Sequence, residues 1–141
     1  MRNDFELSAN FKMSEFYRTD HEDLFQDNFR CSRHPGVIRN LKSLCFFIMQ
    51  KVRDNFDAPV IITSGYRCPE LNERVGGSPT SQHMLGEAAD FRVKGYTDEE
   101  VVDWISNNKS ITFGQLILEP NWVHVSLPHP NKKFNILINK K

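Results

Sequence analysis

The longest amphipathic pattern in the chain runs from Pro35 to about Phe56. Apolar residues recur in it at spacings of three and four, which is the period of an α-helix with one buried face. They are Val37, Ile38, Leu41, Leu44, Cys45, Ile48, Met49, Val52 and Phe56. Because proline suits the first position of a helix, the pattern predicts one long core helix over residues 35–56.

Shorter apolar runs predict β-strands after this helix. The first, Val60–Thr63, is rich in β-branched residues and is bounded by Pro59 and by Ser64–Gly65, which is typical of a short buried strand. Four more strand-like runs follow, at about 89–93, 113–119, 122–127 and 134–138.

Two further helices are expected. One is short, at Ser14–Tyr17, and the other begins after Thr97 and ends near Asn107, with Glu100 completing a capping box. Strands interrupted by helices predict an α+β fold in which a small antiparallel sheet packs against the helices. The 141 residues are about the length of one domain, so we expect a single domain over residues 1–141.

Composition excludes several classes of protein. The 18 Lys and Arg residues balance 18 Asp and Glu residues, so no basic excess indicates nucleic-acid binding. No run approaches the roughly 18 consecutive apolar residues of a membrane span. The 3 cysteines are too few for a disulfide scaffold. We expect a monomer that binds no nucleic acid and does not cross a membrane.

Two segments carry histidines in a setting that suggests chemistry. Residues 81–90 read SxHxxGxAxD and residues 122–126 read WVHVS. His83, Asp90 and His124 together suit a catalytic zinc site, which uses three imidazole or carboxylate ligands and leaves a fourth position for water. The other histidines, His21, His34 and His129, are interpreted as surface residues.

A predicted hairpin brings a further carboxylate to this group. If Pro120 and Asn121 form a two-residue turn, Ile117 faces His124, and Glu119 shares a face with Trp122 and His124. Glu119 is then a diagonal neighbour of His124, about 7–8 Å away between backbones, and can reach a water on the metal. The alternative is an ordinary amphipathic hairpin whose exposed face carries Glu and His.

The motifs resemble a known family when they are taken together. Ser-Gly-Tyr-Arg at residues 64–67, SxHxxGxAxD and the late WVHVS resemble the D-alanyl-D-alanine carboxypeptidase family of zinc peptidases, in the lysostaphin, D-Ala-D-Ala peptidase and hedgehog superfamily. The resemblance runs from the segment at Ser14 to Leu127, and short bacterial and bacteriophage cell-wall peptidases are the most similar members. It implies a hedgehog/D-Ala-D-Ala peptidase-like fold, one Zn²⁺ ion and a peptidoglycan peptide substrate.

The resemblance also implies roles for single residues. His83, Asp90 and His124 match the zinc ligands, and Glu119 matches the catalytic carboxylate. Arg67 matches the arginine that contacts the substrate carbonyl and the developing oxyanion. Two substrate-binding candidates complete the set. Ser81 supports the site or contacts substrate, and Trp122 lines the groove or covers the hairpin. In some branches a second histidine stands where this chain has Trp122, so the acid–base work here falls to Glu119.

Several alternatives stay open at this point. Cleavage between two D-alanines describes a carboxypeptidase, and cleavage of the L-Ala–D-Glu bond describes an endopeptidase of the endolysin type. A dipeptidase that acts on free D-Ala-D-Ala is a second enzyme hypothesis. A non-catalytic, zinc-stabilised module that binds peptidoglycan or a protein is the alternative of a different class.

The N-terminal residues lead to an expectation about location. They contain no apolar core of a signal peptide, so we expect synthesis and folding in the cytoplasm. Action on the cell wall would then follow release by lysis, through a pore or within a phage particle. A phage or prophage gene and a cellular gene both fit this expectation.

Overall fold

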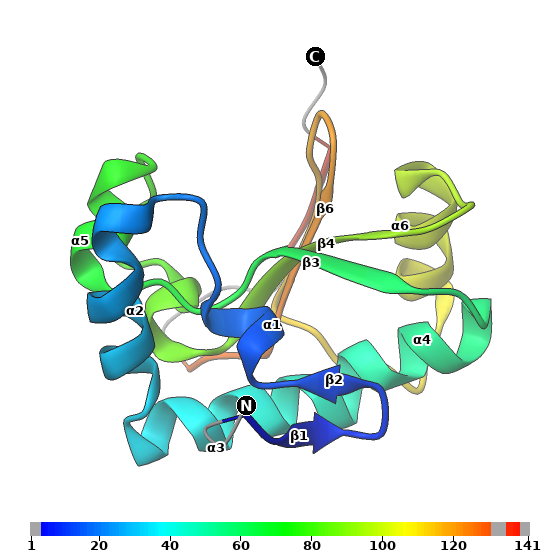
Figure 1. Ribbon diagram of the computed structural model, residues 1–141. Coiled ribbons are helices and arrows are strands. Elements are labelled where there is room, and N and C mark those ends of the chain that lie inside the picture. Colours follow the sequence, from blue (N-terminus) through cyan, green and yellow to red (C-terminus); the bar gives the residue numbers. More distant parts are fainter. Residues whose placement is uncertain (1–3, 131–134, 139–141) are drawn as a thin grey trace.

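A five-stranded sheet and a long helix organise the computed structural model, which describes residues 4–130 and 135–138 (Figure 1). The sheet has the strand order β3–β4–β6–β5–β7, and β1 and β2 form a separate hairpin. The strands are β1 (Glu6–Ser8), β2 (Phe11–Lys12), β3 (Val60–Ser64), β4 (Ala88–Val93), β5 (Gln115–Leu118), β6 (Val123–Ser126) and β7 (Asn135–Ile138).

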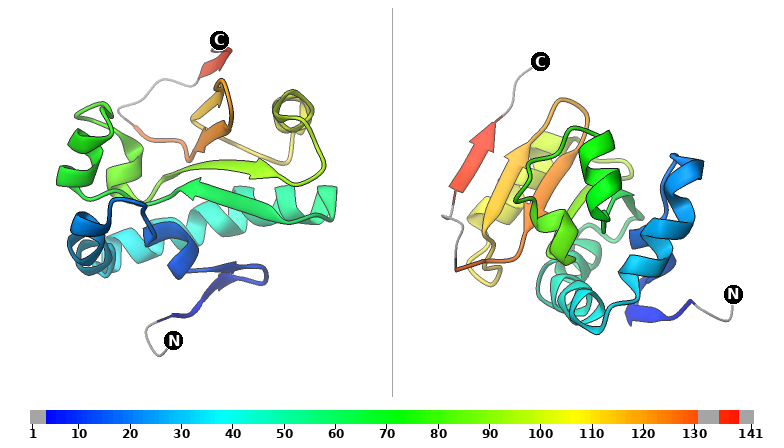
Figure 2. Two further views of the ribbon diagram at one scale, coloured as in Figure 1. Left: turned by 45° about the horizontal axis from the view of Figure 1, so that its top comes forward. Right: turned by 90° about the vertical axis from the view of Figure 1, so that its left-hand side faces the viewer.

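Helices surround the sheet on one face and at its ends. They are α1 (Ser14–Tyr17), the 3₁₀ helix η1 (Glu22–Leu24), α2 (Phe25–Ser32), α3 (Pro35–Leu44), the π-helix η2 (Cys45–Met49), α4 (Gln50–Phe56), α5 (Pro69–Arg74), the 3₁₀ helix η3 (Gln82–Leu85) and α6 (Asp98–Asn107). The α2 and α5 helices lie toward one end of the molecule and α6 toward the other (Figures 1 and 2). No described helix is both long and apolar enough to cross a membrane.

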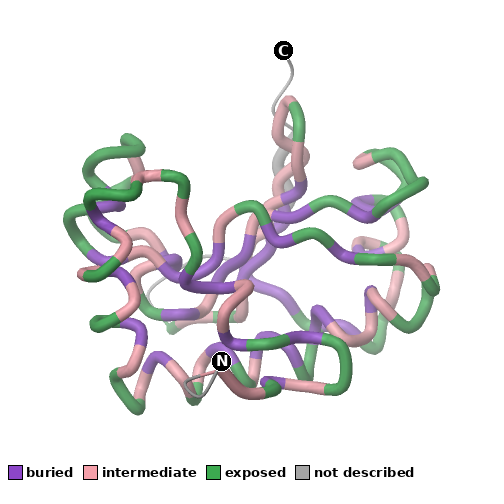
Figure 3. Tube along the Cα trace, viewed as in Figure 1, coloured by how far each residue is buried: buried purple, intermediate pink, exposed green. Residues whose placement is uncertain are grey.

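The long predicted helix is confirmed, with one irregular turn. The α3, η2 and α4 segments follow one another without a gap from Pro35 to Phe56, and η2 is a π-helical stretch. Six apolar side chains along them have no exposed surface: Leu41, Leu44, Cys45, Ile48, Met49 and Val52. This buried face belongs to one core with apolar residues of the sheet. Figure 3 marks buried residues in purple both along the helix and along the strands.

The predicted α+β fold is also confirmed. Each expected strand is present within a residue or two of its predicted range, and the capping box of Thr97 and Glu100 opens α6. The β3, β4, β6 and β5 strands pair antiparallel, but β7 pairs parallel to β5 at the edge of the sheet. The sequence pattern did not indicate this one parallel pair. Of the run expected at 134–138, Phe134 lies outside the described residues.

Six elements of the structure have no counterpart in the sequence analysis: β1, β2, η1, α2, α5 and η3. The α2 helix shows why. Its fully buried residues include Asn28 and Ser32, so polar side chains occupy positions where a hydrophobic period would be sought. The α5 helix has only 6 residues and begins with Pro69, which leaves little room for any period.

Candidate functional site

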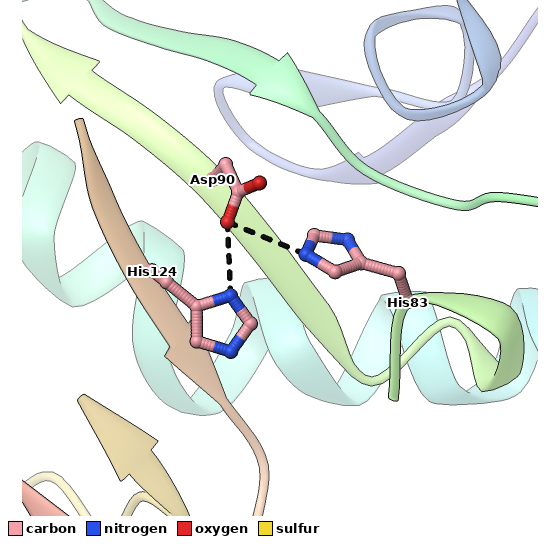
Figure 4. Close-up of side chains that lie close together, drawn as sticks. All are labelled: His83, Asp90 and His124. Carbon is pink, nitrogen blue, oxygen red and sulfur yellow. Dashed lines mark hydrogen bonds and ion pairs between the residues drawn. The ribbon is translucent and has the colours of Figure 1, made fainter. Parts of the chain in front are cut away.

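Three elements bring His83, Asp90 and His124 together (Figure 4). His83 lies on η3, Asp90 on β4 and His124 on β6. Asp90 and His124 are direct partners in the antiparallel pairing of β4 with β6, so their side chains share a face of the sheet. Alternation along β6 sends Val123 and Val125 to the opposite face, where both are fully buried in the core.

Hydrogen bonds fix the orientation of the His83 ring. The hydroxyl of Ser81 accepts a bond from the backbone N–H of His83 and caps η3. The Nδ1 atom of His83 lies 2.7 Å from the carbonyl oxygen of Gly65. Because a carbonyl can only accept, we assign the proton to Nδ1. The lone pair of Nε2 then faces the carboxylate Oδ1 of Asp90, 3.3 Å away.

These three side chains fit a metal ion. The Oδ1 atom of Asp90 also lies 2.9 Å from Nδ1 of His124, and one ligand atom from each residue lies within 4.8 Å of the other two. A cation between the lone pair of His83 and the carboxylate would remove the repulsion between them. Two imidazoles and one carboxylate are the ligand set of a catalytic zinc site with an open position. In the described part of the chain, this is the only such group of three.

Burial and charge shift the pKa values of His83 and Asp90 in the directions that favour metal binding. Burial lowers the pKa of His83, so its imidazole is neutral over a wider pH range, although Asp90 partly opposes this. Burial raises the pKa of Asp90, but the two histidines lower it by more, and its net pKa falls below the ordinary value. A neutral imidazole and an ionised carboxylate are the forms that bind metal.

Arg67 lies beside this group at the end of the segment that follows β3. Its backbone N–H donates to the carbonyl oxygen of His83 at 3.1 Å, and its Nη2 lies 3.4 Å from the hydroxyl of Ser81. Its Nε is buried and has no hydrogen-bond partner among the described residues. Burial lowers the pKa of Arg67, while the Asp90 carboxylate partly offsets this. The structure therefore places Arg67 and Ser81 beside His83, in the group that could hold a metal ion.

The predicted hairpin places Glu119 and Trp122 on the same side. The N–H of Glu119 donates to the carbonyl oxygen of Trp122 at 3.0 Å, and Ile117 pairs with His124 as the two-residue turn requires. A cavity of about 450 Å³ lies over this face. All seven predicted site residues line it: Arg67, Ser81, His83, Asp90, Glu119, Trp122 and His124.

A second cavity, of about 540 Å³, adjoins the group at Asp90. The segment Arg18–His21 lines it, together with residues of β3. The sequence analysis interpreted His21 as a surface residue, and the structure places it in the lining of this second cavity. No local motif marks this segment. Tertiary contacts bring it there, among them a 3.2 Å hydrogen bond from Arg18 to the carbonyl oxygen of Ile62 in β3.

Two residues to which the sequence analysis assigned no role in the site support the segment carrying Arg67. The carboxamide of Asn28 is fully buried and donates to the carbonyl oxygens of Tyr17 and Tyr66, while its oxygen accepts from the N–H of Cys68. Gly65 passes so close to α1 that a Cβ atom would lie 2.7 Å from backbone atoms of Phe16. Both contacts hold the backbone on either side of Arg67.

Comparison with known proteins agrees with this geometry. A search of curated proteins found no match to the chain. A family model described as Peptidase M15 matches residues 10–126, which include α1, both sides of the hairpin and all seven predicted site residues. Such a family implies a hydrolase that acts on peptide bonds. With most of its length matched, and as the resemblance of its motifs predicted, the chain belongs to the peptidase M15 family.

Proposed function

We propose that this protein is a zinc-dependent peptidase that hydrolyses the stem peptides of peptidoglycan. The observation that carries the proposal is the convergence of His83, Asp90 and His124 within 4.8 Å on one face of the sheet, in a chain of the peptidase M15 family. The substrate follows from the family resemblance. The chain has a formal net charge of zero, which agrees with a substrate whose recognition does not depend on a strongly charged surface.

The residues around the metal group supply the rest of the proposed chemistry. His83, Asp90 and His124 would hold a zinc ion, which would lower the pKa of its bound water toward about 7 and polarise a carbonyl group. Glu119 accepts the proton of the attacking water and passes it to the leaving amine. Arg67 donates hydrogen bonds to the carbonyl oxygen as it becomes negative, a contribution of about 10²–10³ in rate for one such donor. Ser81 holds the guanidinium of Arg67 in this direction.

The products would be a new free amine and a new carboxylate on the stem peptide. The proposal includes both the bond between two D-alanines and the L-Ala–D-Glu bond, and mass spectrometry of the fragments distinguishes them. The carboxypeptidase and endolysin types of activity, and action on the cell wall after release from the cytoplasm, are all part of this proposal.

The test compares the zinc-loaded protein with three variants on purified peptidoglycan. Glu119→Gln removes the proposed base but no metal ligand, and Asp90→Asn removes a ligand charge. Glu99→Gln is the matched control, because Glu99 is exposed in the first turn of α6 and lines neither cavity. Zinc per chain is measured by elemental analysis, and hydrolysis by the appearance of new amine ends.

We expect the wild-type protein and Glu99→Gln to hold one zinc ion and to cleave. Glu119→Gln should hold zinc and lose at least about 100-fold in turnover, since general base catalysis contributes about 10²–10⁴. Asp90→Asn should lose both zinc and turnover. Full turnover by Glu119→Gln would contradict the assignment of the base. Zinc binding by the wild-type protein with no new amine ends would favour the non-catalytic module instead.

A further inference from the structure

The two cavities meet at Asp90, one of the three proposed metal ligands. Asp90 stands on β4, which has β3 on one side and β6 and then β5 on the other. The 540 Å³ cavity is lined by Ile62–Ser64 of β3, whereas the 450 Å³ cavity is lined by residues of β5 and β6. Four residues line both cavities: Arg67, Val75, Asp90 and Trp122. Of the three proposed metal ligands, Asp90 lines both cavities, whereas His83 and His124 line only the 450 Å³ cavity. The hollow therefore runs across the strands, with Asp90 where its two parts meet.

Each side is large enough for more than one small residue. Volumes of about 540 and 450 Å³ fall in the range of pockets that bury a drug-sized ligand, about 300–1,000 Å³. A carboxypeptidase acting on a terminal alanine needs such space on only one side of the scissile bond. Space on both sides is instead what a chain that continues past the scissile bond requires.

The cavity on the β3 side also carries ionisable groups that no other site uses. Arg18, Asp20 and His21 line it, and in the described part of the chain neither Arg18 nor Asp20 forms an ion pair. Arg18 is held toward β3 by its bond to the carbonyl oxygen of Ile62. The Asp20 carboxylate can pair with an ammonium group, and Arg18 with a carboxylate, so this side suits a residue with an ionised side chain.

We infer that the segment Arg18–His21 forms a second substrate subsite and that the enzyme cleaves an internal bond of a longer peptide that carries an ionised side chain on this side. The inference rests on the proposed function and narrows it from a peptidase of either kind to an endopeptidase. It makes Arg18 and Asp20 specificity-determining residues of the groove.

The first experiment compares two substrates of the zinc-loaded wild-type protein. One is a stem pentapeptide with a diamino acid at its third position, acetylated at the N-terminus and amidated at the C-terminus. The other is free D-Ala-D-Ala. We expect internal cleavage of the blocked peptide, with a kcat/KM at least 10-fold above that for the dipeptide. If only a peptide with a free C-terminus is cut, and only its last residue is released, the protein is a peptidase but the inference is wrong. If neither substrate is cut, and peptidoglycan is not cut either, the proposed function is wrong. The inference, which rests on it, is then wrong as well.

The second experiment measures binding without turnover. Calorimetry follows the blocked peptide as it binds to zinc-loaded Glu119→Gln, alone and combined with Asp20→Ala or Arg18→Ala. We expect each added substitution to weaken binding at least fivefold, and each single variant with an intact Glu119 to show the loss in KM more than in kcat. Glu22→Ala and Arg30→Ala are matched controls, because both residues are exposed and line neither side of the groove. Unchanged binding in the Asp20→Ala and Arg18→Ala combinations would overturn the subsite.

Discussion

Asn28 offers the sharpest test of how the fold supports Arg67. Its buried carboxamide makes three hydrogen bonds to backbone atoms, at 2.7 Å to Tyr17, 3.2 Å to Tyr66 and 2.7 Å to Cys68. Tyr66 and Cys68 are the two neighbours of Arg67 in the chain. Asn28→Ala should therefore both destabilise the protein and loosen the guanidinium that we assign to the oxyanion.

The size of the effect follows from the groups left without partners. The substitution leaves two carbonyls and one N–H in the interior without this hydrogen-bond partner. Each such group lowers the free energy of unfolding by about 1–3 kcal/mol. Because such costs do not add fully when the groups share one site, we expect a loss of about 3–5 kcal/mol. The free energy of unfolding of a small domain is about 5–15 kcal/mol, so the variant should still fold at low temperature. Asn28→Asp keeps the volume and the acceptor but loses both donors, and should also cost at least about 2 kcal/mol.

Urea unfolding, zinc content and kcat/KM are the three measurements. Asn40→Ala is the control, because the Asn40 side chain donates one exposed hydrogen bond, to the carbonyl oxygen of Leu85, and its loss should cost under about 1 kcal/mol. We expect Asn28→Ala to keep its zinc, since no ligand is touched, and to lose at least about 10-fold in kcat/KM, a part of the roughly 10²–10³ that one oxyanion donor contributes. The reasoning is refuted if Asn28→Ala is as stable as Asn40→Ala, or if it is destabilised but turns over at the wild-type rate.

Two further predictions concern the same segment. Gly65→Ala should cost about 1–3 kcal/mol and weaken zinc binding, because the new Cβ would lie 2.7 Å from the backbone of Phe16 and displace the carbonyl that orients His83. Gly95→Ala is the control, because no atom of the described residues lies within 4 Å of the added Cβ. It should lower the free energy of unfolding by only about 1–2 kcal/mol, for its positive φ, and leave the zinc affinity unchanged. Equal zinc affinities in the two variants would contradict this prediction. Burial raises the pKa of Tyr66 to about 12, so between pH 10 and 12 the unfolded chain loses this proton while the folded chain keeps it. The free energy of unfolding should fall as the pH rises through this window, less steeply in Tyr66→Phe, and an identical slope in both proteins would show that Tyr66 does not titrate in this way.

Local patterns in the sequence were sufficient for the elements whose buried faces are apolar. The helix over residues 35–56 and the strands β3, β4, β5 and β6 were predicted because period and residue type agree with their burial. The hairpin register was predictable for a similar reason, since a two-residue turn leaves one pairing of Ile117 with His124. The resemblance to zinc peptidases added the roles of the residues on that hairpin, which spacing alone left open.

Other features depend on contacts between residues distant in the chain. The pairing of Asp90 with His124 joins two strands that are 34 residues apart, and nothing in the local sequence of either strand determines it. The α2 helix buries Asn28 in place of an apolar residue, so its role became visible only through three contacts with other segments. Likewise, Arg18 borders the groove through its contact with β3 and not through any motif of its own.

The same long-range contacts explain why the metal group is assembled by the polypeptide itself. Asp90 and His124 are fixed by a register whose opposite face is packed in the core, so a slip of one residue would expose Val123 and Val125. His83 is fixed by the Gly65 carbonyl, and that carbonyl is fixed by the close packing of Gly65 on α1. Since each of the three side chains is held by protein contacts, a metal ion would find its proposed ligands already placed, unlike a metal site that forms only when a small domain folds around the ion. A site that exists before the metal arrives can keep one coordination position open, because its geometry does not depend on a fourth protein ligand.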